Sequence, residues 1–565
     1  MLTPGVTYER QVEFTRHGPV VMHVVEAPKP GGLYSLKPVL SNGAIVGRET
    51  VSAMQRRLAP AATTVGVNGD LFAWADGRPS GVLMQGGVLQ APPNDGRSAL
   101  GIDATGLLRM DKVQWFGTWQ GTGQRRTING FNAAPGANGI SLYTPAWGPN
   151  TPVVDGATIV VLQPFPPTAP NGDLTGTVIA IAQVPTSAIP PDGAVLVARG
   201  IAAQRLAAEV ASGGTVTVRL LLKPDWQGIV DAIGGGPALV RDGVAVFRPN
   251  EQFTTDQMLP RHPRTAVGQR ADGALVMIAV DGRRPGYSTG MTNYELAQAL
   301  VRLGVVTGMA LDAGGSTTLA FEGQVLNRPS DGAEREVSEG LFVFYEGVHA
   351  PPAATSTLTF NGDGVDERQE LSYKLVRPST VSATLVAPDK SVTFTELVSA
   401  RPAGTYRYSF NGATFGPEPL QGRWHWVITS TDDLGRQSAI DRGFWVNSTL
   451  GGLTVAPSLL RAGAKGAALQ VDFSIASRAR VRLTIETPGG VLIRTLVRGT
   501  LNPGGFTYSW DGRDFTRALV HSGSYVAHVT TDNAYGPMEL AQRFAVKRVV
   551  VKPKPKPKPK KKRRG

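Results

Sequence analysis

The sequence predicts an α+β fold: a mixed-sheet domain with few helices, followed by two all-β sandwiches and a disordered basic tail. Its 565 residues include 68 glycines and 42 prolines, and only 18% are charged, which is typical of loop-rich, β-dominated proteins. Most apolar runs are short and end at turn residues. The last third repeats an earlier pattern at a distance of about 100 residues. This length predicts several domains.

The net charge of +13 comes mainly from the C-terminus. Eleven lysines and arginines and no acid follow residue 546; subtracting them leaves +2 for the rest, so we do not expect the folded body to bind nucleic acid. The absence of cysteine excludes thiolate chemistry. No apolar run is long enough for a membrane helix. The N-terminus lacks the apolar core of a signal peptide, so either the protein stays inside the cell or this sequence begins after a leader.

The first part of the chain, 1–347, is predicted to be one domain. Strands and one helix near 49–58 precede a strand at 63–67, which ends at an Asn-Gly turn signal. Residues 80–225 read as short strands. Three glycines at 234–236 do not form a dinucleotide-binding loop, because the spacing and the following helix are missing; close backbone approach is the better account.

The stretch 261–319 has the clearest pattern. An apolar run at 274–280 predicts a buried strand. Thr292 and Glu295 have capping-box spacing, so a helix should start there and stop at Gly304. A second strand at 305–311 follows. Asp281 and Asp312 come just after these two strands, where scaffolds often hold functional side chains.

Beyond a Pro/Ala-rich linker at 347–357, two similar units are predicted at 355–448 and 449–548. Their alternating apolar pattern, with turns about every ten residues, is typical of Ig-like β-sandwiches. The second unit contains Trp510-Asp-Gly-Arg-Asp514, Gly523-Ser-Tyr525 and Asp532, and it resembles the FlgD-type Ig-like module found on many secreted bacterial enzymes.

Two features of this half offer weaker hypotheses. Asp363 and Asp366 lie in an oxygen-rich turn that could hold Ca²⁺, although an Asx-turn explains it as well. The Lys/Pro tail at 549–565 predicts an extended spacer, which is either simply solvated or an attachment to an anionic cell-wall polymer.

Residues 286–290 match the G-x-S-x-G pattern of serine esterases, followed in order by Asp312 and His349. The structural context that a catalytic serine needs is missing, because Ser288 is not directly on a strand-to-helix turn and His349 falls in the linker. A serine esterase using Ser288 remains an alternative.

A second constellation combines carboxylates for acid/base work, arginines for a phosphate and short polar side chains for sugar hydroxyls. Its members are Asn68, Arg264, Thr265, Asp281, Arg283, Asp312 and Ser316, with Asn327, Ser330, Glu334 and Arg335 in the next loop.

In their order along the chain, these residues and their surroundings resemble the phosphodiester glycosidase family, whose best-known member removes a capping N-acetylglucosamine from mannose 6-phosphate. The matching motifs are Val67-Asn-Gly-Asp-Leu-Phe72, Gly234-Gly-Gly-Pro237, Arg264-Thr-Ala-Val-Gly268, Asp281-Gly-Arg283, Leu311-Asp-Ala-Gly-Gly-Ser316 and Asn327-Arg-Pro-Ser330. Two positions depart from the family pattern: Ala313 replaces a glycine, which limits a left-handed backbone, and Asp70 adds an acid.

The resemblance implies a hydrolase of carbohydrate metabolism that cleaves a sugar-1-phosphodiester at the anomeric carbon. We expect Asp312 to be the main catalytic carboxylate, Asp281 a second carboxylate or the partner of Arg264, and Arg264 a phosphate ligand. The expected substrate-binding residues are Asn68, Asp70, Thr265, Arg283, Ser316, Asn327 and Arg335.

The resemblance also implies a sugar-phosphate glycan as partner and a secreted or cell-envelope location. No cofactor is firmly implied, and a Ca²⁺ or Mg²⁺ ion at Asp281 or Asp312 stays open. A non-catalytic carbohydrate-binding or adhesion protein of the cell envelope is the alternative from another class.

Overall fold

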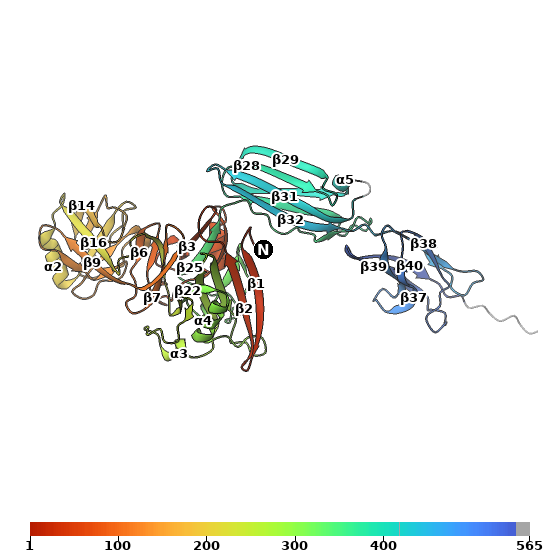
Figure 1. Cartoon of the computed structure of the whole chain (residues 1–565), viewed down its shortest axis with the longest axis horizontal. Coiled ribbons are helices and arrows are strands. Elements are labelled where there is room, and N and C mark those ends of the chain that lie inside the picture. The colour runs from red at the N-terminus through yellow and green to blue at the C-terminus, as the bar shows by residue number, and fades with distance from the viewer. Residues whose placement is uncertain (417–418, 550–565) are drawn as a thin grey trace, which may run out of the picture. The chain divides into compact units, whose positions relative to one another are not determined.

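A computed structural model describes residues 1–416 and 419–549. It contains two compact units, Met1–Gly347 and Val348–Gly565, and the described part is mostly β, as the sequence predicted (Figure 1). The predicted tail at 549–565 lies almost entirely outside the described residues.

Two packed sheets form the centre of the first unit. The seven-stranded sheet has the order β1 Thr7–Thr15, β2 Gly18–Ala27, β21 Leu275–Val280, β20 Arg264–Arg270, β22 Val305–Ala310, β18 Ala238–Arg241 and β19 Val244–Ala245. The five-stranded sheet has the order β24 Gln324–Val325, β23 Leu319–Phe321, β4 Thr63–Asn68, β25 Glu339–Tyr345 and β3 Tyr34–Leu40. One buried cluster joins Val267 and Met277 of the first sheet to Val67 and Leu341 of the second.

A helix covers the outer face of each of these sheets. Helix α4, Asn293–Arg302, buries Leu296 and Leu300 against the seven-stranded sheet, and Figure 1 shows it beside β22 and β2. Helix α1, Val51–Leu58, packs Met54 against the five-stranded sheet. The layers therefore run helix, sheet, sheet, helix, and central strands such as β4 and β21 are buried on both faces.

The start of α4 follows the predicted capping box. The Thr292 side chain accepts a hydrogen bond from the Glu295 backbone N–H at 3.2 Å, and the Glu295 carboxylate accepts one from the Thr292 N–H at 2.9 Å. These two bonds satisfy donors that a helix N-terminus otherwise leaves unpaired. The predictions for the helix and for the strands on either side of it are confirmed.

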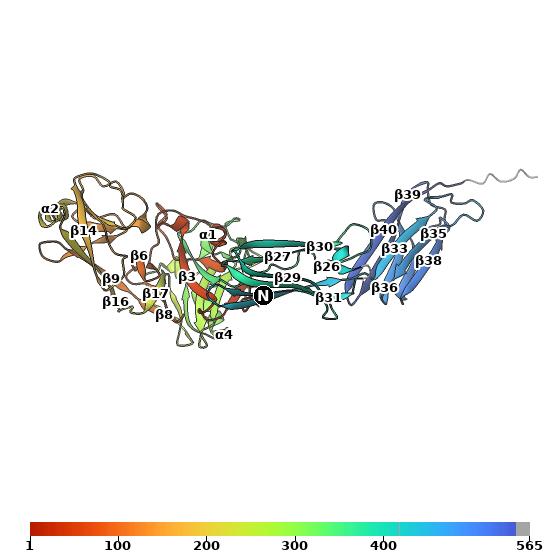
Figure 2. The ribbon, with the colours of Figure 1, turned by 90° about the horizontal axis from the view of Figure 1, so that it is seen from above.

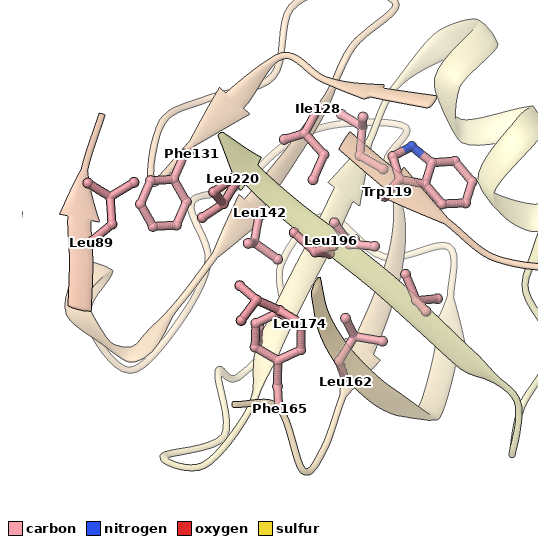
Figure 3. Close-up of a cluster of buried hydrophobic side chains, with 14 of the residues drawn as sticks. Leu89, Trp119, Ile128, Phe131, Leu142, Leu162, Phe165, Leu174, Leu196 and Leu220 are labelled. Carbon is pink, nitrogen blue, oxygen red and sulfur yellow. The ribbon is translucent and has the colours of Figure 1, made fainter. Parts of the chain in front are cut away.

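Two further sheets extend the first unit (Figure 2). One contains β6 Val88–Ala91, β5 Leu83–Gln85, β17 Ile229–Gly234, β7 Ser98–Asp103 and β8 Leu108–Lys112. The other contains β10 Arg126–Ile128, β9 Gln114–Gln120, β16 Thr215–Lys223, β14 Asp173–Ala182, β13 Thr158–Leu162, β15 Ala194–Ala198, β12 Ile140–Tyr143 and β11 Gly130–Phe131. Trp119, Leu142, Leu162 and Leu196 pack together inside the eight-stranded sheet (Figure 3).

Helix α2, Gly200–Glu209, corrects the expectation that 80–225 contains only strands. Its N-cap residue, Arg199, makes no side-chain capping bond, so the sequence carries no start signal. Ala203 and Leu206 nevertheless anchor it to the core of the eight-stranded sheet. Burial of these apolar side chains fixes the helix where local signals are weak. Helix α3, Thr255–Met258, lies further along the chain.

The second unit holds two similar pairs of sheets. The first pair joins β26 Thr357–Leu358, β32 Gln437–Val446, β31 Gly422–Asp432, β28 Ser379–Val386 and β29 Val392–Arg401 to β27 Arg368–Leu375 and β30 Gly404–Asn411; α5, Gly412–Phe415, follows β30. The second joins β34 Leu459–Leu460, β40 Gly536–Val546, β39 Gly523–Asn533, β36 Ala479–Glu486 and β37 Leu492–Leu501 to β33 Leu450–Ala456, β35 Leu469–Ile475 and β38 Gly504–Trp510. Each pair encloses its own apolar core.

Candidate active site

The strongest candidate site lies at one edge of the two central sheets. Strand β22 ends at Ala310, opposite Ala266 of β20, and Arg264 at the start of β20 pairs with Val280 at the end of β21. The backbone N–H of Asp312 donates to the carbonyl of Gly69, just beyond β4, at 2.9 Å. Chain segments far apart in sequence therefore meet at this edge.

A cavity of about 520 Å³ opens here. Its ionisable lining side chains are Asp256, His262, Arg264, Arg283 and Asp312. Leu71, Phe253 and the segment from Gly236 to Pro237 supply apolar and backbone surface. The cavity thus combines carboxylates with two guanidinium groups in a volume that suits a small polar ligand.

Asp312 is the half-buried carboxylate of this cavity. Burial raises its pKa to about 6, and the nearby Asp70 adds to the rise. Hydrogen bonds from the Ser316 hydroxyl and the Ala313 N–H, the latter at 2.8 Å, oppose the rise, as does the charge of Arg335. A carboxyl group that titrates near pH 6 can act as an acid or a base close to neutral pH.

The turn after Asp312 explains why Ala313 is tolerated. Ala313 has an extended backbone, with φ −119° and ψ −176°. The left-handed conformation falls on Gly314, with φ +69°, and a Cβ there would meet the Arg283 guanidinium at 3.0 Å. The expected restriction at Ala313 therefore does not arise, because the next residue makes the turn.

Arg264 has a buried guanidinium held by backbone carbonyls. It donates to Met291 at 3.0 Å and to Gln257 and Pro260 at 2.9 Å each. Burial, together with the charge of Arg283, lowers its pKa to about 10. These bonds tie α3 and the start of α4 to β20, so Arg264 shapes the cavity wall as well as charging it.

Arg283 and His262 lie side by side on the same wall. The Arg283 Nη2 is 3.2 Å from the His262 Nδ1. Burial and the charges of Arg283 and Arg264 lower the pKa of His262. A lowered pKa favours the neutral form of His262, so the positive charge of this wall comes from the two arginines.

Asn68 and Thr265, expected to bind substrate, are buried cross-links. The Thr265 hydroxyl donates to Asn68 Oδ1 at 2.7 Å, and the Thr318 N–H donates to the same oxygen at 3.1 Å. Asn68 Nδ2 donates to the carbonyl of Asp312 at 2.8 Å. Both side chains are 0% exposed and absent from the cavity lining, so they position the Asp312 turn.

Asp281 is not paired with Arg264, contrary to one of the two expected roles. Its carboxylate is fully buried and lies 2.9 Å from His23 Nε2. It also accepts hydrogen bonds from the Tyr287 hydroxyl at 2.9 Å, the Asn327 side chain at 3.2 Å and the Arg328 N–H at 2.8 Å. These donors hold its pKa below the usual value despite burial.

Asn327 completes this buried group. Its Nδ2 also donates to the Thr317 carbonyl at 3.1 Å, and its Oδ1 accepts from the Leu319 N–H at 2.8 Å. The group therefore ties the 327–330 loop to the strand that carries Asp281. Neither Asp281 nor Asn327 lines the cavity.

Asp70 belongs to a buried acidic pair that the sequence did not indicate. Its backbone N–H donates to Glu339 Oε1 at 3.2 Å, and Arg97 Nη1 lies 3.5 Å from its Oδ1. Burial raises the pKa of Asp70 and raises that of Glu339 well above the usual range. Glu339 starts β25, and Arg97 lies in the turn before β7; neither follows a local motif, so no sequence signal pointed to them.

Ser316 connects Arg335 to Asp312 through hydrogen bonds. Arg335 Nη1 donates to the Ser316 Oγ at 3.3 Å, and the Ser316 hydroxyl bonds to Asp312. The Arg335 guanidinium lies over the ring of Trp74, 5.3 Å from its centroid. Trp74 is 64% exposed, which makes it an aromatic surface connected to the candidate carboxylate.

The structure contradicts an esterase that uses Ser288. This side chain is 0% exposed. Its hydroxyl donates to the Asp281 carbonyl at 2.5 Å and accepts from the Val21 N–H at 3.0 Å. A nucleophile must reach its substrate and a general base, and both positions around this oxygen are taken by backbone groups.

The turn at 361–366 is an Asx-turn. Asp363 accepts hydrogen bonds from the Val365 N–H at 2.8 Å and the Asn361 amide at 3.4 Å, and Asp366 has φ +51°. Across residues 1–416 and 419–549, no three His, Asp or Glu side chains gather as a metal site would require. The helices of these same residues include none with the length and apolarity of a membrane span.

Comparison with known proteins shows which protein families two stretches of the chain match. Residues 168–344 match the phosphodiester glycosidase family model, and residues 458–534 match the FlgD Ig-like domain. The chain therefore carries a phosphodiester glycosidase domain and a FlgD Ig-like domain, which confirms both resemblances.

Individual relatives are similar over limited stretches. The SPbeta prophage-derived uncharacterized protein YomE of Bacillus subtilis (strain 168) is 38% identical over 119 residues, 21% of this chain and 18% of that protein. The N-acetylglucosamine-1-phosphodiester alpha-N-acetylglucosaminidase of Bos taurus is 40% identical over 68 residues, 12% of each chain. The matches thus span less than a fifth of these relatives. A hypothetical protein from Synechocystis has a similar crystal structure, with a TM-score of 0.52 and 26% identity over 60% of this chain and 62% of that one.

Proposed function

We propose that residues 1–347 hydrolyse a sugar-1-phosphodiester at the anomeric carbon, releasing a free sugar and leaving a phosphomonoester. The observation that carries this proposal is the cavity in which Asp312 shares a wall with the guanidinium groups of Arg264 and Arg283. A carboxylate suits chemistry at the anomeric carbon, and guanidinium groups suit the phosphate.

The chemistry of the leaving group determines what the carboxylate and the arginines must each do. A phosphomonoester, whose second pKa is about 6, needs less protonation than a sugar alcohol and more charge stabilisation. Asp312 would act as the base or nucleophile in its ionised form, which dominates above its pKa of about 6. Arg283 would bind the phosphate through free N–H donors.

Arg264 contributes to the same wall in a second way. A guanidinium has five N–H donors, and the backbone carbonyls accept three of them. The remaining two would support the phosphate. Asn68, Thr265, Asp281 and Asn327 would act as positioning residues, because they hold the Asp312 turn and its neighbouring loop without lining the cavity.

The test is sugar release from UDP-N-acetylglucosamine and from an α-N-acetylglucosamine-1-phosphodiester. Wild type should release free sugar, and Asp312→Asn should lower the rate by at least about 10³-fold. Arg283→Met should lower kcat/KM by about 10²-fold, which is the scale for losing one charge-stabilising group. Equal rates in the three proteins would refute the assignment.

The remainder of the chain has a supporting role in this proposal. We propose that 355–448 and 449–548 are Ig-like modules that space the catalytic unit from a surface, and that the protein acts outside the cytoplasm on a cell-envelope glycan. The basic tail at 549–565 would attach it to anionic polymer. Deleting that tail should weaken polymer binding at low salt, and unchanged binding would remove this role.

A further inference from the structure

The outer face of one sheet in the second unit carries three exposed arginines that face no acid within ion-pair distance. Arg480 and Arg482 lie on β36, and Arg498 lies on β37. Within the described residues, none of these side chains forms a hydrogen bond or an ion pair. They line a groove of about 610 Å³ together with Thr500, Thr530 and Asp532. We call this surface the arginine groove.

The strand register brings the three charges together. Arg482 stands directly opposite Arg498, so their Cα atoms are about 5 Å apart. Arg480 is two residues along the same strand, about 7 Å away. Like charges in directly opposed positions destabilise a sheet. The one acid of the groove, Asp532, stands opposite Arg480, and Glu539 stands opposite Thr530 on the next strand.

The first repeat shows that the fold does not require these arginines. At the same register positions, Thr380 replaces Arg480 and Ser382 replaces Arg482, and Ser382 faces Leu397 where Arg482 faces Arg498. That face forms a groove of similar size, about 520 Å³, lined by threonine, serine and other uncharged side chains. The three arginines are therefore specific to the second repeat. They lower the stability of the sheet, and no hydrogen bond or ion pair of their side chains within the described residues offsets this loss.

We propose that the arginine groove binds a phosphodiester-linked glycan polymer. Guanidinium groups pair with phosphate oxygens through two parallel hydrogen bonds, and the Thr500 and Thr530 hydroxyls and the backbone of the groove offer partners to sugar hydroxyls. A run of repeating phosphates matches closely spaced positive charges better than a single anion does. We choose phosphate over carboxylate because the function proposed for residues 1–347 acts on a phosphodiester. The location of the binding surface follows from the arginines themselves and does not rest on that function.

The test uses the full chain with Asp312→Asn as background, so that the probe is not cleaved. The patch variant, Arg480→Thr with Arg482→Ser and Arg498→Leu, copies the face of the first repeat. A matched control removes three charges elsewhere: Arg205→Thr, Arg407→Ser and Arg461→Leu. The probe is an immobilised polysaccharide of N-acetylglucosamine units joined by 1-phosphodiester bonds, and thermal midpoints verify that all proteins are folded.

We expect the patch variant to bind at least about tenfold more weakly at low salt and the control to change less than about twofold. The slope of log affinity against log salt should fall by about two for the loss of three phosphate contacts. Equal weakening in the two variants would overturn the proposal, since net charge or the tail would then explain binding. Equal dependence on the patch for polygalacturonate would overturn the choice of phosphate.

A separate assay distinguishes this proposal from the catalytic one. The patch variant with Asp312 intact should hydrolyse soluble UDP-N-acetylglucosamine at the wild-type rate. Loss of polymer binding with unchanged hydrolysis supports the groove. If the wild-type chain shows no hydrolysis yet binds the polymer through the groove, the catalytic proposal fails and the groove stands.

Discussion

Asn68 Nδ2 donates a hydrogen bond of 2.8 Å to the backbone carbonyl of Asp312. The two residues are far apart in sequence: Asn68 ends β4 of one central sheet, and Asp312 follows the end of β22 in the other. This contact, together with the bonds from Thr265 and Thr318 to Asn68, sets the position of the candidate catalytic carboxylate. The site therefore depends on how the two central sheets are packed.

Replacing Asn68 should damage stability and activity together. Asn68→Ala leaves the buried Thr318 N–H and the Thr265 hydroxyl without their acceptor, at a cost of about 1–3 kcal/mol for each unsatisfied group. Denaturant unfolding of the first unit should show a loss of about 3 kcal/mol, and sugar release should fall. Asn171→Ala gives a comparison away from the site. A loss below about 1 kcal/mol at Asn68 would contradict its role as the cross-link.

Asp312→Asn should remove activity and yet raise stability above pH 6. The pKa of Asp312 in the folded protein, about 6, exceeds the unfolded value of about 3.9. The folded state therefore binds the proton more tightly, and ionisation above pH 6 opposes folding by up to about 3 kcal/mol. Thermal midpoints at pH 7.5 should be higher for the variant, and the difference should vanish near pH 4. A lower midpoint at both pH values would contradict the raised pKa.

Asp281→Asn should have the opposite effect on stability. Its folded pKa lies below the unfolded value, so the ionised form stabilises the fold at neutral pH and this contribution is lost as the pH falls through the acidic range. Asn at this position removes the charge that accepts hydrogen bonds from Tyr287, Asn327 and Arg328, and a hydrogen bond to a charged group contributes about 1.5–3 kcal/mol. The thermal midpoint at pH 7 should drop by several degrees, while the exposed turn variant Asp272→Asn should hardly change. A neutral effect of Asp281→Asn would remove its positioning role.

Sequence patterns identified the edge of the central sheets that carries the candidate site. They did not show which of its acids lines the cavity and which one holds other residues in place. Asp281 and Asp312 both follow apolar strands, and local sequence gives them the same appearance. Their difference comes from partners that only the folded chain supplies: His23 and Asn327 surround Asp281, while the turn at Gly314 opens Asp312 to the cavity.

Other site residues gave no local signal at all. Asp256 and His262 line the cavity because Arg264 binds the carbonyls around α3. Glu339, at the start of β25, and Arg97, in the turn before β7, meet Asp70 only in the folded chain. The capped helix α4 and its flanking strands could be predicted because their signals lie within one short segment, whereas α2 lacks a capping residue and depends on its buried face.

Trp74 should contribute to substrate binding more than to turnover. Its exposed ring lies beside Arg335, which connects through Ser316 to Asp312, and aromatic faces are good surfaces for sugar rings because they bury apolar area at small entropic cost. Trp74→Ala should raise KM about tenfold for a phosphodiester with a sugar on both sides and change kcat less than threefold. Phe14→Ala, at another exposed aromatic residue, should leave both constants unchanged. An unchanged KM for Trp74→Ala would exclude this surface from the binding site.

The proposed reaction breaks the bond between the anomeric carbon and oxygen, and hydrolysis in water enriched in ¹⁸O tests this most directly. Wild-type protein, with an α-N-acetylglucosamine-1-phosphodiester as substrate, should place the label on the released sugar and leave the phosphomonoester unlabelled, as measured by mass spectrometry before sugar exchange. Asp312→Asn should give neither product. Label in the phosphate, showing cleavage between phosphorus and oxygen, would contradict the assignment of Asp312 to chemistry at the sugar.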